Sequence, residues 1–159
     1  MLACRNAKRG ESAREEIVGD TGNPNVALML VDLSSQESIR SFAEEFEQKY
    51  SHLDVLVNNA GIYASKRILT VEGTESTFAI NYLALFLLTH LLLDLLKASA
   101  PARVVNITSE AQRNGKIDFS DLQGERKYSG MKAFGPKLVV VVYKEPSITQ
   151  FFRHIPRDQ

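Results

Sequence analysis

Polar side chains suited to binding or catalysis stand directly after three short apolar runs of the sequence. These positions are Asp32, Asn58–Gly61 and Ser109. The carboxyl ends of parallel strands meet at one edge of a sheet, and ligands bind there. We therefore expect a carboxylate, an amide-rich loop and a hydroxyl at a common edge, where a ligand could bind. Taken singly, each residue is also ordinary loop chemistry.

The elements that must position these residues begin with three predicted strands. Runs rich in Val, Leu and Ile predict strands over Val26–Val31, Leu53–Val57 and Arg103–Thr108. Continuous apolar runs are typical of strands buried on both faces. A further strand end is expected at Leu2-Ala3-Cys4.

Two predicted helices separate the three apolar strands. Ser34 followed by Glu37 is a capping-box signature, which predicts a helix from there to Tyr50. The apolar stripe of this helix consists of Ile39, Phe42, Ala43 and Phe46. A longer helix is predicted over Glu72–Ala98, and Pro101 prevents its continuation. Helices alternating with apolar strands indicate right-handed crossovers, and therefore a parallel sheet covered on both faces.

The composition is that of one globular unit. The 159 residues suit a single domain, and 44% of them are hydrophobic. Lys+Arg and Asp+Glu both number 19, which gives no electrostatic reason to expect nucleic acid or an anionic membrane as a partner. The single Cys4 cannot form an internal disulfide, so a cytoplasmic location is expected. The apolar stretch Leu83–Leu96 contains His90 and Asp94 and is shorter than a membrane span, so it is expected to be a core helix.

Several separated motifs, in this order, resemble the short-chain dehydrogenase/reductase family. They are Asn58-Asn59-Ala60-Gly61, Phe78-Ala79-Ile80-Asn81-Tyr82 and Val104-Val105-Asn106-Ile107-Thr108-Ser109. The similarity covers about Leu2–Phe134, and Ala3-Cys4-Arg5-Asn6 resembles the retinol-dehydrogenase-like branch. The resemblance implies a Rossmann-like, doubly wound α/β fold. It also implies an oxidoreductase that moves a hydride between NADP(H) or NAD(H) and an alcohol or carbonyl substrate.

The resemblance assigns an adenosine-binding role to residues after the first two strands. Arg5 matches the position that meets the adenosine ribose, where a guanidinium can pair with a 2′-phosphate. NADP is therefore favoured and NAD is possible, while the alternative is that Arg5 is a surface charge. Asp32 matches the carboxylate that accepts a hydrogen bond from the adenine amino group, and Leu33 stands beside it.

The asparagine-rich loop is expected to face the cofactor. Asn58 matches the asparagine that ties the central strand of the family's sheet. Asn59, Ala60 and Gly61 match the positions that the cofactor approaches. Gly61 can equally be a turn glycine that needs a positive φ.

Catalytic roles follow from the same resemblance. Ser109 matches the serine that hydrogen-bonds the substrate oxygen, and Asn81 matches the helix asparagine that holds a water in the proton relay. The catalytic tyrosine is replaced by Phe134, which has no proton to give, and general acid/base catalysis is typically worth about 10²- to 10⁴-fold. Lys137 follows Phe134 by three positions instead of the family's four, a displacement of about 100° on a helix. Pro136 removes a backbone N–H and favours a non-helical segment.

Tyr128 and Lys132 formally satisfy the Tyr-x-x-x-Lys spacing. By alignment they precede the true motif, in a loop-like stretch that contains Gly130. The ordinary pKa of tyrosine is about 10, so Tyr128 would need a lysine and a cofactor close by to act near neutrality. We expect this displaced pair not to replace the catalytic residues.

Two parts of the family pattern are not recognised. The fingerprint Thr-Gly-x-x-x-Gly-x-Gly, which receives the cofactor pyrophosphate, does not occur in the sequence. In the strand order 3-2-1-4-5-6 the strand before that fingerprint lies in mid-sheet, so we expect an incomplete sheet and weak cofactor binding. The run Val139–Val142 is the replacement strand that the sequence offers, across a long loop.

No motif of the family is recognised in the sequence after Lys137-Leu138. We therefore divide the chain into a partial dinucleotide-binding domain, residues 1–138, and a divergent tail, residues 139–159, without the family's later strands. The abrupt change beside a one-residue deletion resembles a reading-frame change or an alternative exon.

Three interpretations of the function stay open. The first is hydride transfer with a small alcohol or carbonyl substrate, impaired or inactive in this chain; the branch alone suggests a retinoid or another lipophilic alcohol. The second is a non-catalytic fragment that forms a homo- or heterodimer through Glu72–Ala98, the helix that this family often uses in dimers. The third is a truncated product without function.

Overall fold

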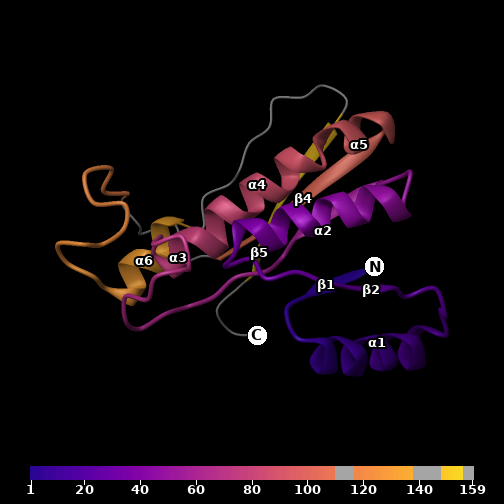
Figure 1. Ribbon diagram of the computed structural model, residues 1–159, viewed down its shortest axis with the longest axis horizontal. Helices are drawn as coiled ribbons and strands as arrows, with labels where there is room; N and C mark the ends of the chain where they lie inside the picture. Colours follow the sequence, from indigo (N-terminus) through magenta and orange to yellow (C-terminus); the bar gives the residue numbers. More distant parts are fainter. Residues whose placement is uncertain (110–116, 138–147, 156–159) are drawn as a thin grey trace.

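The computed structural model describes residues 1–109, 117–137 and 148–155 (Figure 1). The strands are β1 Leu2–Cys4, β2 Leu28–Leu30, β3 Val55–Asn58, β4 Ala102–Ser109 and β5 Ile148–Ile155. The helices are α1 Ala7–Thr21, α2 Gln36–Lys49, α3 Ser76–Phe78, the π-helical η1 Ala79–Leu83, α4 Ala84–Leu91, α5 Leu93–Ala98 and α6 Gly130–Lys137. The predicted strands and helices occur in the predicted order, and the incomplete Rossmann-like α/β fold is confirmed.

The parallel strands form two sheets instead of one. β1 pairs with β2, and β4 lies between β3 and β5. Among the described residues no strand joins β1 to β3, as expected when the strand in mid-sheet is missing. Val55 and Val57 are two residues apart and therefore point to the same face of β3. They are 42% and 53% exposed, so this face is poorly covered.

The tail contains a strand that the sequence does not predict. β5 runs parallel to β4 along its whole length, from Ala102 opposite Ile148 to Ser109 opposite Ile155. Pairing with the free edge of β4 satisfies backbone N–H and C=O groups and does not require the family's side chains. The sequence analysis gives no signal for a strand at Ile148–Ile155, so β5 is a feature that only the structure reveals. The suggested replacement strand Val139–Val142 lies outside the described residues.

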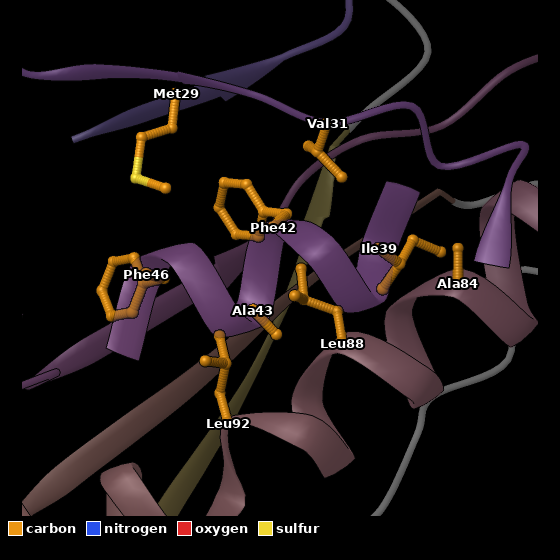
Figure 2. Close-up of a cluster of buried hydrophobic side chains, with 9 residues drawn as sticks. All are labelled: Met29, Val31, Ile39, Phe42, Ala43, Phe46, Ala84, Leu88 and Leu92. Atoms are coloured by element: carbon orange, nitrogen blue, oxygen red, sulfur yellow. The ribbon is translucent and has the colours of Figure 1, made fainter. Parts of the chain in front are cut away.

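The main hydrophobic core lies between β2, α2 and α4 (Figure 2). Figure 2 shows α2 between the side chains of Met29 and Val31 on one side and those of α4 and Leu92 on the other. The predicted stripe of α2 is confirmed, because all of its members are buried: Ile39, Phe42, Ala43 and Phe46. Burial of a large apolar side chain stabilises by roughly 1.5–3 kcal/mol. This shared core therefore fixes α2 against both neighbours.

Helix α1 covers the face of the β1–β2 sheet opposite α2 (Figure 1). Gly10 allows the close approach, because a Cβ at this position would stand 2.5 Å from Cys4 Sγ and 2.8 Å from a Leu28 methyl carbon. A larger residue would push α1 away from both strands.

The long predicted helix Glu72–Ala98 starts later than expected and is not continuous. Glu75 caps its first turn: the carboxylate accepts hydrogen bonds from the N–H groups of Thr77 (2.8 Å) and Phe78 (2.9 Å). The chain then passes through α3, η1 and α4, is interrupted at Leu92 and continues as α5. The predicted end at Ala98 is confirmed.

The start of α2 also differs from the predicted capping box. Ser35 is the N-cap, and its hydroxyl accepts a hydrogen bond from the Ser38 N–H (3.3 Å). Glu72 Oε1 accepts from the Gln36 N–H (2.7 Å), so a residue of the later loop completes this helix start. Ser34, the predicted cap, lies before the helix.

The segment around Phe134 is helical, so the expectation of a non-helical segment is wrong. Helix α6 spans Gly130–Lys137 and includes Pro136. Gly130 and Ala133 are buried, and this packing outweighs the unfavourable local propensity of the proline.

Candidate functional site

The carboxyl ends of β1 and β2 bring Arg5 and Asp32 together. Cys4 pairs with Leu30, so the residues that follow lie at the same edge. Asp32 Oδ1 accepts hydrogen bonds from the Ser34 N–H (2.9 Å) and the Ser34 hydroxyl (2.6 Å). Partial burial opposes the charged form of Asp32, but these hydrogen bonds and the positive charge of Arg5 hold its pKa below the ordinary value. The edge thus presents an ionised carboxylate beside a guanidinium.

Leu33 directly follows Asp32 at this edge, and its side chain lies toward the protein interior. It is half-buried and packs against the main core. An apolar side chain here can give one side of a planar ligand a surface while Asp32 meets its polar edge.

A layer of buried polar side chains supports the loop after β3. Asn58 is 3% exposed, and its Nδ2 donates to Asn106 Oδ1 (2.9 Å) and Thr89 Oγ1 (3.2 Å). Asn58 and Asn106 also stand opposite each other in the β3–β4 register. The amide of Asn58 therefore ties β3 to both β4 and α4.

Asn59, Ala60 and Gly61 form an exposed surface beyond this layer. Gly61 is not among the glycines with positive φ, so the explanation as a positive-φ turn glycine is wrong. A Cβ on Gly61 would meet Asn81 Oδ1 at 3.7 Å, an ordinary contact. No contact within the described residues thus requires a glycine at position 61. The absence of a side chain there leaves room for a ligand.

Asn81 holds this loop from the helix side. It lies in η1 and is 1% exposed. Its Oδ1 accepts from the Ile62 N–H (2.8 Å) and its Nδ2 donates to the Ile62 carbonyl (2.9 Å). Two hydrogen bonds to one backbone residue fix the chain directly after Gly61. π-Helical turns of this kind frequently occur at functional sites.

The end of β4 and helix α6 carry the other predicted catalytic positions. Ser109 is the last residue of β4 and pairs with Ile155. In α6, the Phe134 ring meets the Tyr63 ring edge to face, with centroids 5.8 Å apart and planes at 79°. Lys137 is the last residue of α6. Helix α6 therefore holds the Phe134 phenyl ring against Tyr63.

Tyr128 stands before α6, so it and Lys132 do not form a helical Tyr-x-x-x-Lys pair. Its hydroxyl donates to the Ala64 carbonyl (2.8 Å) and lies 3.4 Å from Glu75 Oε1. Burial, together with the negative charge of Glu75, raises the pKa of Tyr128 above its ordinary value. These contacts favour a structural role for the phenol.

Three buried polar residues escape the sequence-based prediction of the site. They are Glu75, Thr89 and Asn106. Thr89 and Asn106 stand within apolar runs of the sequence. A polar side chain buried in such a run needs a hydrogen-bonding partner, so their position could have indicated a buried polar contact. Glu75 precedes Ser76 and Thr77 at a helix start, but its contacts with distant segments have no local signature.

The described part of the chain holds no group of three or more His, Cys, Asp or Glu residues able to bind a metal ion. None of its helices is long and apolar enough to cross a membrane. The apolar stretch Leu83–Leu96 is divided at Leu92 between α4 and α5.

Residues 1–145 match the family profile described as short chain dehydrogenase. Retinol dehydrogenase 12 of Mus musculus is 48% identical over 134 residues, which cover 84% of this chain and 42% of the relative. Retinol dehydrogenase 13 of Homo sapiens is 43% identical over 145 residues, covering 90% of this chain and 44% of the relative. The chain thus spans about two fifths of the length of these curated relatives.

Solved structures give the same result. An uncharacterised protein from Mycobacterium paratuberculosis has a TM-score of 0.71 and 37% identity, over 85% of this chain and 46% of that one. The Pseudomonas aeruginosa RhlG/NADP active-site complex has a TM-score of 0.61 and 28% identity, over 86% of this chain and 50% of that one. The chain therefore belongs to the short-chain dehydrogenase family and is similar to its retinol dehydrogenase members.

Proposed function

We propose that this chain carries the adenosine-binding part of a nicotinamide-dependent oxidoreductase and does not itself complete hydride transfer. The observation that carries the proposal is the phenyl ring of Phe134 in α6, because the resemblance matches this residue to the family's tyrosine. A bound nicotinamide supplies or accepts the hydride at an alcohol or carbonyl carbon. The proton on the substrate oxygen must then move through an acid/base group, and a phenyl ring has none.

The adenosine end of NADP fits the edge formed by β1 and β2. Arg5 is exposed and lies near Asp32, so it can meet a 2′-phosphate while Asp32 accepts from an adenine amino group and Leu33 supports the ring. The exposed loop Asn59–Gly61 offers the cofactor a surface without large side chains. The NADP complex of the similar Pseudomonas aeruginosa protein supports NADP as the cofactor, with NAD possible.

Binding of the cofactor by these 159 residues is proposed to be weak. The pyrophosphate of a dinucleotide is normally received by backbone N–H groups of a glycine-rich turn at a helix start. The sequence contains no such turn. At α1 the Asn6 side chain already accepts from the Arg9 N–H (3.0 Å).

The remaining parts of the site keep the roles implied by the family. Ser109 would hydrogen-bond the substrate oxygen, and Asn81 would keep the loop after β3 and a relay water in place. Lys137 would lie off its usual face. The substrate class is a small lipophilic alcohol or carbonyl compound, as the names of the retinol dehydrogenase relatives suggest. A cytoplasmic location also stays a proposal.

The test is NADPH oxidation with a lipophilic aldehyde, followed in the wild-type chain, Ser109→Ala and Tyr128→Phe. We expect the wild-type rate to equal that of Ser109→Ala. Turnover that is present in the wild type and lost in Tyr128→Phe would overturn the proposal, because the displaced tyrosine would then be the acid.

A second candidate function is pairing with a full-length relative or a second copy through Glu72–Ala98. It is favoured by two exposed apolar side chains of this segment, Leu83 in η1 and Phe86 in α4, which are 36% and 46% exposed. Sedimentation of the wild type and Phe86→Glu measures it. A monomer at all concentrations in both chains would argue against self-pairing.

A further inference from the structure

Glu75 is fully buried, and no part of the proposed reaction uses its carboxylate. Burial of a charged group is costly unless hydrogen bonds compensate it. Oε1 accepts from the Thr77 N–H and Oε2 from the Phe78 N–H, at the start of the helical segment that contains Asn81. The favourable field of a helix start adds to these bonds.

The same residue contacts the segment that leads into α6. Its backbone N–H donates to Gln123 Oε1 (3.0 Å), and its Oε1 lies 3.4 Å from the Tyr128 hydroxyl. Arg67 adds a second connection, because its Nε donates to the Gln123 carbonyl (2.9 Å). The segment 123–128 is therefore attached to the helix start and to the loop after β3 at once.

Helix α6 begins directly after this attachment and touches the loop after β3. The Tyr128 hydroxyl donates to the Ala64 carbonyl (2.8 Å). A Cβ on Gly130 would stand 2.7 Å from the same carbonyl oxygen, so α6 approaches the loop as closely as a glycine allows. Further along α6, Phe134 packs against Tyr63.

We propose that Glu75 is a positioning residue that sets where α6 lies relative to Asn81 and the loop after β3. Its carboxylate acts through Tyr128, while its backbone N–H holds Gln123, so Tyr128 is a positioning residue as well. That α6 holds residues of the site rests on the proposed function. The contacts themselves do not depend on it.

The test compares Glu75→Gln with Glu72→Gln. Glu75→Gln keeps the side chain's length and one acceptor oxygen, while Glu72→Gln removes the same charge from the residue that caps α2. Hydrogen exchange is measured by mass spectrometry on peptides covering α6 and α2. Loss of one hydrogen bond to a charged group is expected to speed exchange in α6 about tenfold in Glu75→Gln. Glu72→Gln should affect the first turn of α2 and leave α6 unchanged.

A spectroscopic signal separates positioning from a general loss of stability. In the chain labelled with 3-fluorotyrosine, the ¹⁹F resonance of Tyr63, assigned with Tyr63→Phe, reports on the neighbouring Phe134 ring. It should shift in Glu75→Gln and in Tyr128→Phe. It should not shift in Tyr50→Phe, which removes a hydroxyl from a ring that packs on Phe46.

An unchanged Tyr63 resonance with unchanged exchange in α6 would overturn the proposal. Equal acceleration of exchange in α2 and α6 would overturn it too, because Glu75 would then stabilise the whole fold. If Glu75→Gln does not fold, Tyr128→Phe decides by the same two readouts. Neither readout uses cofactor or substrate, so failure here is distinct from failure of the proposed function.

Discussion

Replacing Asn58 with leucine is expected to destabilise the β3–β4 pair by about 1–3 kcal/mol. The Asn58 amide donates to Asn106 Oδ1 at 2.9 Å, and both residues are at most 5% exposed. Leucine has the same branched shape and the same number of side-chain heavy atoms, so the main loss is the donor, which leaves Asn106 Oδ1 buried without that bond. Thr89 Oγ1 loses less, because its own hydroxyl still donates to the Leu85 carbonyl (2.7 Å).

The double variant Asn58→Leu/Asn106→Leu makes this prediction sharp. It removes both partners, and with them Asn106 Nδ2, a buried donor without a partner among the described residues. Replacing a buried polar pair by apolar groups can be nearly neutral. The double variant should therefore lose less stability than the sum of the two single variants. Urea unfolding followed by circular dichroism measures the four chains. A coupling energy within about 0.5 kcal/mol of zero would show that the two amides are independent.

Three further predictions concern the sheets, the phenol and the cofactor. Because no described strand joins β1 to β3, the β1–β2 sheet should lose amide protection at lower urea than the β3–β4–β5 sheet; one common transition would contradict this. Because the pKa of Tyr128 is raised, its contribution to stability is complete below about pH 10 and is lost as pH rises through the folded-state pKa. Urea midpoints should therefore fall more steeply above pH 10 in the wild type than in Tyr128→Phe, and parallel curves would refute the assignment. Arg5→Ala should abolish any preference for NADPH over NADH; a preference that survives would make Arg5 a surface charge.

Features that depend on local periodicity are predictable from the sequence. The stripe of α2 from Ile39 to Phe46 is buried as expected, because a helical repeat of apolar residues has only one way to face a core. The strand ends before Asp32 and Asn58 are also correct to within about a residue. The family motifs stand at strand ends, and the carboxyl ends of parallel strands share one edge. The motifs therefore predicted which residues lie at that edge.

Features that depend on contacts between distant segments are not predictable in this way. Glu72 belongs to α2's capping and not to its own helix, because it meets Gln36 across a loop. Likewise, β5 is defined by pairing with β4, and its sequence carries no family motif. Helix α6 forms despite Pro136 because Gly130 and Ala133 pack against the rest of the protein.

Calorimetric titration of the 159-residue chain with NADPH tests the central proposal most directly. The adenosine-binding edge at Arg5 and Asp32 is present, but the turn that receives the pyrophosphate is not in the sequence. We expect a dissociation constant of about 1 mM or weaker, which corresponds to a binding free energy no stronger than about −4 kcal/mol. A micromolar dissociation constant would contradict the account, because another part of the chain would then have to supply the phosphate site.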